Sequence, residues 1–290
     1  MKLQDIHIRD PFILVDDGKY YLYGTRGKDC WTDASGFDVY ISTDSINWSD
    51  PIPVFEKSND FWADQQFWAP EVHKHNDKFY MFASFKSANH CRATHILVSD
   101  KPTGMFVPVS SEPATPAEWE CLDGTFYIDK AGIPYIVFCH EWVQVSDGEI
   151  WAQQLTADLK GIIGTPTLLF KASSPPWATG DTFGTNTPKF VTDGPYLFRQ
   201  SEKALYLIWS TIKDARYVEA CAISDNGEIT GNWIHCEEFL FSADGGHGML
   251  FTDLDGNLKF VMHSPNSSPN ERPIILGMCI NDGNLSLRNQ

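Results

Sequence analysis

A three-part pattern of strands and turns occurs five times along this chain of 290 residues. Each copy opens with a polar cluster containing glycine or proline, which runs into an apolar strand. A tight turn then leads to a second strand rich in aromatic and β-branched residues, and a third strand closes on a Ser/Thr-Asp or Asn-Asp signal. The copies begin at Arg9, Trp68, Leu122, Thr192 and Gly245. Apolar runs joined by turns such as Asp-Gly are typical of antiparallel hairpins.

The spacing of the copies selects one architecture. They recur every roughly 50–70 residues, a period in the range of propellers. Amphipathic helical periodicity is almost absent, and a two-sheet sandwich would explain neither the five equal units nor their polar heads. The sequence therefore predicts an all-β fold over residues 1–290, a single five-bladed β-propeller in which each blade is an antiparallel sheet around a central channel.

A ring of this kind brings the polar heads together, because the innermost strand of each blade faces the axis. We expect Asp10, Glu71, Asp123, Asp193 and His247 to converge at one end of the channel. An aspartate before glycine or proline is also common in ordinary turns. The shared position of Asp10, Asp123 and Asp193 at the heads of successive repeats favours a functional role for these three instead.

Charge and hydropathy restrict the partners. Acidic residues outnumber basic ones by 38 to 22, which argues against nucleic acid and anionic membrane surfaces and suits a neutral substrate. The sequence contains no run of 18 apolar residues, so it predicts no membrane span.

The seven cysteines lack metal-ligand spacing, and we expect buried free thiols of the kind found in a reducing compartment. The first residues contain no apolar signal region. These features predict a cytoplasmic protein, or a periplasmic or secreted one whose signal peptide was removed.

Acidic heads and abundant aromatics suit carbohydrate chemistry. Hydrolysis of a bond between sugars needs two carboxyl groups, one to donate a proton and one to attack or to activate water. A third nearby carboxylate raises the pKa of the acid. Trp68 and Trp142 are candidates to stack on a sugar ring. Glu71 either binds substrate or caps its strand, and His247 is either a turn residue or a ligand, direct or through water, to a cation in the channel.

Six motifs, taken in order, resemble glycoside hydrolase family 43 over nearly the whole chain. They are Arg9-Asp10-Pro11-Phe12, Trp68-Ala69-Pro70-Glu71-Val72, Leu122-Asp123-Gly124, Asp193-Gly194-Pro195-Tyr196, Gly246-His247-Gly248 and His263-Ser264-Pro265-Asn266. The resemblance implies a five-bladed propeller and an inverting glycosidase acting on α-L-arabinofuranosides or β-D-xylosides, with galactan-active members as an alternative. It implies a general base at Asp10, a carboxylate that raises the pKa of the acid at Asp123, the general acid at Asp193, and a histidine associated with channel calcium at His247.

One position departs from the family pattern, which has Glu-Gly-Pro where this chain has Asp193-Gly194-Pro195. Aspartate is one methylene shorter, and a misplacement of about 1 Å can cost about a hundredfold in rate. Three outcomes are open: Asp193 acts as the acid, Glu141 replaces it, or the chain has lost hydrolysis and only binds glycans. A scaffold for protein partners would instead need an exposed apolar patch. We expect an inverting glycosidase that acts on plant-type glycans containing arabinose or xylose.

Overall fold

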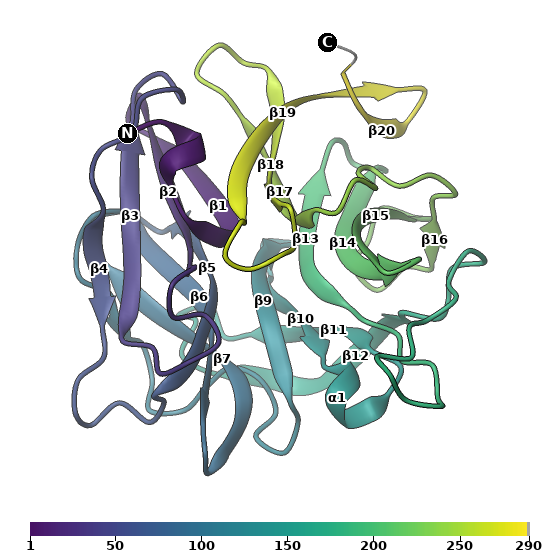
Figure 1. Ribbon diagram of the computed structural model, residues 1–290, viewed down its shortest axis with the longest axis horizontal. Helices are drawn as coiled ribbons and strands as arrows, with labels where there is room; N and C mark the ends of the chain where they lie inside the picture. Colours follow the sequence, from purple (N-terminus) through teal and green to yellow (C-terminus); the bar gives the residue numbers. More distant parts are fainter. Residues whose placement is uncertain (289–290) are drawn as a thin grey trace.

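The structure, a computed structural model, describes residues 1–288 and arranges them as five four-stranded antiparallel sheets around a central axis (Figure 1). Within every sheet the strands follow one another in chain order. The predicted five-bladed β-propeller is therefore confirmed. The three-part sequence pattern accounts for the three inner strands of each blade, whereas a fourth, outer strand was not predicted.

The strands run as follows. The first blade comprises β1 (Ile8–Asp16), β2 (Lys19–Arg26), β3 (Gly36–Ser42) and β4 (Ile52–Glu56). The second comprises β5 (Gln65–His75), β6 (Lys78–Ser87), β7 (His90–Ser99) and β8 (Val107–Pro108). The third comprises β9 (Cys121–Ile128), β10 (Pro134–His140), β11 (Glu149–Leu155) and β12 (Ile162–Lys171). The fourth comprises β13 (Asp193–Arg199), β14 (Leu205–Lys213), β15 (Arg216–Ser224) and β16 (Trp233–His235). The fifth comprises β17 (Gly246–Thr252), β18 (Leu258–Ser264), β19 (Arg272–Asn281) and β20 (Asn284–Leu287).

Helical structure within residues 1–288 is limited to two short segments, η1 (Leu3–Asp5) and α1 (Trp142–Val145). β10 ends at His140, and the next residue, Glu141, is the N-cap of α1. Neither helical segment is long and apolar enough to cross a membrane.

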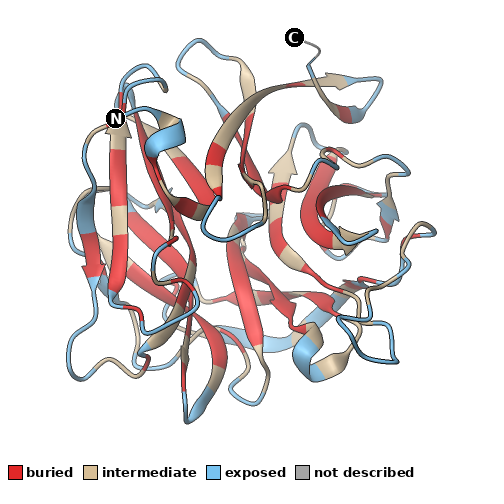
Figure 2. Ribbon diagram, in the orientation of Figure 1, coloured by how far each residue is buried: buried red, intermediate tan, exposed pale blue. Residues whose placement is uncertain are grey.

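Aromatic side chains fill the spaces between blades. Figure 2 shows the inner strands buried and the peripheral loops exposed. Between the first two blades, Phe37 and Phe55 pack against Phe67 and Phe85, with ring centroids 5.6–6.1 Å apart. Such pairs stabilise a core beyond the area that they bury.

All seven cysteines are free thiols, as predicted. The expectation of burial holds for four of them, whereas Cys91, Cys236 and Cys279 are only partly buried.

Each innermost strand bends at the same place. The pairing of the first two strands of every blade is interrupted by a bulge, and the bulge contains one residue with φ between 47° and 57°. These five residues are Asp10, Ala69, Asp123, Gly194 and His247. A bulge re-aims neighbouring side chains and is common beside active sites, so the repeat directs a set of side chains to one end of the channel.

Candidate active site

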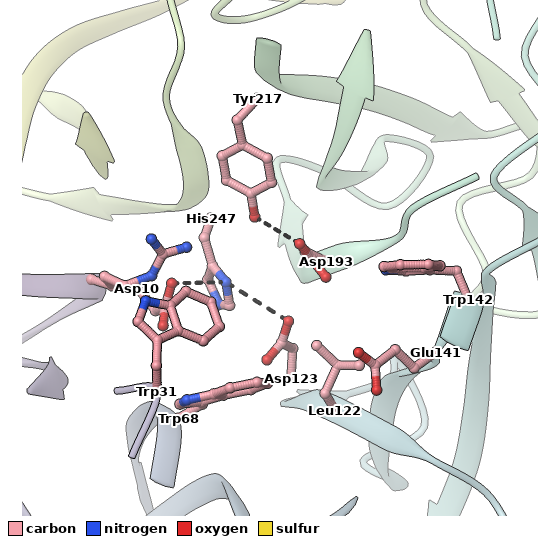
Figure 3. A pocket seen from close by; sticks show the side chains of 11 residues that line it. Asp10, Trp31, Trp68, Leu122, Asp123, Glu141, Trp142, Asp193, Tyr217 and His247 are labelled. Atoms are coloured by element: carbon pink, nitrogen blue, oxygen red, sulfur yellow. Dashed lines mark hydrogen bonds and ion pairs between the residues drawn. The ribbon is translucent and has the colours of Figure 1, made fainter. Parts of the chain in front are cut away.

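A pocket of about 200 Å³ lies where the bulges of the five blades meet (Figure 3). It is lined by Arg9, Asp10, Trp31, Trp68, Leu122, Asp123, Glu141, Trp142, Asp193, Tyr217 and His247. Seven of the eight candidate site residues named from the sequence are in this set. The ring thus brings together carboxyl groups that are up to 183 residues apart in sequence, from Asp10 to Asp193.

The bulge explains which side chains reach the pocket. Asp10, Asp123 and His247 are the bulge residues with positive φ in their blades. Asp193 is one residue earlier, at the position that Arg9 and its counterparts occupy in the other blades, because it pairs with Ser210 as Arg9 pairs with Thr25. Asp193 therefore approaches the pocket from a different strand position than the other two aspartates.

Glu71 occupies a third position, two residues after the bulge residue Ala69. Its carboxylate is buried and lies 2.9 Å from Nε2 of His73. The structure does not bring Glu71 to the pocket wall formed by the described residues. Glu71 was predicted to lie with the aspartates because the strand head alone does not show where the bulge falls.

The backbone of each bulge is held by the preceding blade. The N–H groups of Ala69, Asp123 and His247 donate to the hydroxyls of Thr25, Ser84 and Ser210, at 2.8, 2.8 and 2.6 Å. The Asp10 N–H lies 3.2 Å from Nδ1 of His263. These residues all come from the second strand of the neighbouring blade. Blade-to-blade contacts therefore fix the pocket side chains in place.

The fourth bulge breaks this rule in an informative way. Cys139 stands where the other second strands carry Thr25, Ser84, Ser210 or His263. The Gly194 N–H instead donates to Oδ2 of Asp123 at 3.0 Å. At the fourth bulge, therefore, the backbone N–H binds a carboxylate instead of a side chain of the second strand. A hydrogen bond donated to a carboxylate favours its charged form.

Asp10 is arranged to remain ionised. Thr25 donates its hydroxyl to Oδ2 at 2.5 Å, and Nδ1 of His247 lies 3.3 Å from Oδ1. Burial opposes ionisation, but His247, Arg9 and His263 outweigh it, so the pKa of the Asp10 carboxyl lies below its usual value. A buried carboxylate that keeps its charge is suited to accept a proton.

Asp193 is arranged to hold a proton. Burial, reinforced by the nearby Asp123, raises the pKa of Asp193 to about 7. Burial and the charge of Asp10 also raise the pKa of Asp123. Asp123 accepts from Gly194 and lies 3.7 Å from Nδ1 of His247, whereas the hydrogen bond to Asp193 comes from the Tyr217 hydroxyl at 3.2 Å. The Gly194 N–H and His247 favour the charged form of Asp123, whereas the proton on Asp193 is favoured by burial and by the neighbouring Asp123.

Glu141 lines the same side of the pocket but is paired with a cation. Arg92 forms a buried ion pair with its carboxylate, and the Arg92 guanidinium also lies 4.3 Å from the ring centroid of Trp68. Burial raises the pKa of Glu141, and Arg92 opposes that change. Because the ion pair favours the charged form of Glu141, this residue is less suited than Asp193 to donate a proton.

Four pocket residues were not predicted from the sequence: Arg9, Trp31, Leu122 and Tyr217. Arg9 and Leu122 each stand directly before a bulge residue. Asp193 occupies the same position in its own blade, so a comparison of the repeats could have identified them. Trp31 lies in the loop between β2 and β3, and Tyr217 lies at the start of β15. Neither is part of the repeated strand head, and no pattern in the sequence identifies them.

The donor set does not fit a calcium site built from protein groups. Within residues 1–288, no three His, Cys, Asp or Glu side chains are grouped as ligands of one metal ion. Nδ1 of His247 faces Asp10 and Asp123. Calcium takes six to eight oxygen ligands, so a channel calcium ion associated with His247, directly or through water, stays a prediction.

Known proteins resemble this chain in both sequence and structure. The model of a family described as "Glycosyl hydrolases family 43" matches residues 5–284. The structure of an endo-arabinase from Bacteroides thetaiotaomicron VPI-5482 is 41% identical, covers 98% of both chains and superposes with a TM-score of 0.91. An endo-1,4-beta-xylanase from the same strain is 27% identical, covers 98% of this chain and 95% of its own, and has a TM-score of 0.80.

A curated relative, a xylosidase/arabinosidase from Bacteroides ovatus, is 29% identical over 143 residues. The match covers 44% of this chain and 44% of the relative, so it spans less than half of that protein.

Proposed function

The chain belongs to glycosyl hydrolase family 43, and on that basis we propose that it hydrolyses arabinose- or xylose-containing glycans with inversion at the anomeric carbon. The observation that carries the proposal is the convergence of Asp10, Asp123 and Asp193 on one pocket. Two of these carboxyl groups have separated pKa values, since that of Asp10 is lowered and that of Asp193 is raised to about 7. A pair of carboxyls with separated pKa values is suited to act as base and acid.

In the proposed mechanism, Asp10 takes a proton from a water molecule on one face of the sugar. The water oxygen forms a bond to the anomeric carbon while the bond to the leaving oxygen breaks. Asp193 transfers its proton to that oxygen, so the net reaction is the addition of one water molecule. Inverting enzymes perform this displacement in a single step.

Asp123 is proposed to tune and orient the acid. Its negative charge disfavours ionisation of Asp193, and its Oδ2 accepts the N–H of Gly194, the residue next to Asp193. One side chain therefore acts on both the proton affinity and the backbone position of the acid.

The pocket also suggests how the sugar binds. At about 200 Å³ it is smaller than the roughly 300–1,000 Å³ of pockets for drug-sized ligands, and it suits one sugar ring. Trp31, Trp68 and Trp142 supply aromatic surface in its wall. The similarity to an endo-arabinase over 98% of both chains supports arabinan as the first substrate to test.

The proposal is tested by measuring sugar release from arabinan, arabinoxylan, xylan and galactan by the wild type, Asp10→Asn and Asp50→Asn. We expect release from an arabinose- or xylose-containing glycan. Loss of a general base lowers kcat by about 10²–10⁴, so Asp10→Asn should do so with an unchanged circular dichroism spectrum. Asp50 is exposed in the loop before β4, and its variant should match the wild type.

The other outcomes separate the alternatives. An Asp10→Asn variant with wild-type turnover would show that Asp10 is not the base. Release from galactan alone would replace the proposed substrate. If the wild-type protein binds these glycans but cleaves none, it is a sugar-binding propeller. That outcome is expected if Asp193 does not serve as the acid.

A further inference from the structure

An exposed phenylalanine stacks on one wall of the pocket. Phe183 lies in the connection between β12 and β13 and is 45% exposed. Its ring is nearly parallel to that of Trp142, with the centroids 4.8 Å apart and the planes at 13°. Trp142 lines the pocket. The large apolar side chain of Phe183 therefore lies at the surface and covers the Trp142 ring of the candidate active site.

The backbone of Phe183 is held in an unfavourable conformation. Its φ is 44°, in the left-handed region that bulky L-residues rarely adopt. Such strain persists where the surroundings enforce it, and it is common at ligand clamps and active sites. Here the Phe183 N–H donates to Oδ1 of Asp181 at 2.8 Å, and the backbones of Asp181 and Lys189 exchange hydrogen bonds of 2.8 and 2.7 Å.

The same loop is fastened to the segment that carries Trp142. Nζ of Lys189 donates to the hydroxyl of Ser146 at 2.7 Å, and Ser146 is the C-cap of α1. The Phe190 N–H also donates to the Ser146 carbonyl at 3.0 Å. These bonds join the loop to α1 and keep the Phe183 ring over Trp142.

Trp142 lies on the acid side of the pocket. Figure 3 shows it beside Asp193 and Glu141, across the pocket from Asp10 and Trp31. The leaving group departs toward the general acid. Given the proposed function, on which this inference rests, we propose that Trp142 is the platform for the sugar ring of the leaving group and that Phe183 is a positioning residue that fixes the Trp142 ring.

The chemistry of the two surfaces matches. The apolar C–H face of a sugar packs on an aromatic ring, and a tryptophan fixed by a neighbouring ring loses little conformational freedom on binding. Glu141 precedes Trp142 and provides acceptor oxygens for hydroxyl groups at the edge of the platform. Phe183 should therefore affect substrates whose leaving group is a sugar and spare those whose leaving group has no ring.

The test compares the wild type with Phe183→Asn and Phe183→Tyr. Asparagine tolerates positive φ but removes the ring, whereas tyrosine keeps it. Each protein is assayed on arabino- and xylo-oligosaccharides and on the corresponding glycosyl fluorides, whose leaving group is fluoride. An aromatic pair contributes a factor of about two to ten in binding. In Phe183→Asn we expect KM for the oligosaccharide to rise by that factor, KM and kcat for the fluoride to stay unchanged, and Phe183→Tyr to retain wild-type values.

A binding measurement separates this inference from the proposed function. Calorimetry with oligosaccharides, in an Asp10→Asn background, should show the same two- to tenfold rise in Kd for Phe183→Asn. If the wild type binds without cleaving, the hydrolase proposal fails and the Kd values still decide the role of Phe183. Wild-type Kd and KM in Phe183→Asn, or an equal rise for the fluoride, would overturn the role of Phe183. If no oligosaccharide binds or is cleaved, both proposals are wrong.

Discussion

At the scale of single residues, the candidate site depends on where each carboxyl lies relative to its bulge. Asp10 and Asp123 are bulge residues, Asp193 precedes one, and Glu71 follows one by two positions. The sequence predicted the first three as pocket residues, but it could not show that Glu71 pairs with His73 away from the pocket wall. Which residue of a strand falls in the bulge depends on hydrogen bonds to the neighbouring strand. The motif at the strand head does not reveal those hydrogen bonds.

The pH dependence of activity tests the assignment of the acid. Asp193 must be protonated to act, and its pKa is raised to about 7, so kcat/KM should fall as pH rises through about 7. Asp10 must be ionised, and its lowered pKa keeps it so at all pH values above its usual range near 4. A pH profile on an oligosaccharide should therefore show an alkaline limb near 7 and no loss between pH 5 and 6.

Two variants identify the group behind the alkaline limb. In Asp193→Asn the limb should disappear, and kcat should fall about a hundredfold or more. In Glu141→Gln the limb should remain. The reverse pattern would assign the acid role to Glu141.

At the scale of elements, the bulge is the unit that builds the site. The sequence predicted the five repeated strand heads, but it did not predict the bulge that interrupts each of them. Its anchoring by Thr25, Ser84 and Ser210 of the preceding blades could not be predicted, because these contacts form only when the ring closes. The outer strands were also missed, since short edge strands such as β8 and β16 carry little hydrophobic pattern.

Gly194→Ala tests the importance of the bulge geometry. Gly194 has φ of 51°, and a Cβ there would lie 2.8 Å from Cγ and Cδ2 of His247. The left-handed conformation alone costs an alanine about 1–2 kcal/mol. We expect a clear fall in Tm and a roughly tenfold to hundredfold loss of kcat/KM, because His247 and Asp193 shift.

Gly161→Ala is the matched control, since its Cβ would meet its nearest neighbour at 3.6 Å. Thermal unfolding of both variants gives the comparison. Equal stability and activity of the two would show that the bulge tolerates a side chain at Gly194.

At the scale of the whole molecule, the ring is closed by side chains. The first blade, at the N-terminal end, lies beside the fifth (Figure 1). Arg9 of β1 pairs with the fully buried Glu271 at 2.7 Å and donates to Asn266 at 2.8 Å. Tyr20 accepts the N–H of Leu254 at 2.9 Å. Because Arg9 also lines the pocket, ring closure and the site share a residue.

Glu271→Gln tests this coupling. Removing one partner of a buried ion pair leaves an uncompensated charge, which typically costs about 3–5 kcal/mol. We expect a loss of about 3 kcal/mol in the free energy of unfolding, together with reduced activity as Arg9 moves. Glu56→Gln removes the partly exposed partner of Arg26 and should cost about 1 kcal/mol or less. If chemical denaturation gives equal losses for the two variants, the closure pair is not a main source of stability.

The most direct test of the central claim is the configuration of the first product. In the proposed mechanism, the propeller brings Asp10 and Asp193 into one acid–base site that adds water in a single displacement. Proton NMR of an oligosaccharide digest in D₂O, followed from the first minutes before mutarotation, reports the anomer released. We predict the configuration opposite to that of the cleaved bond; release of the same configuration would contradict the account.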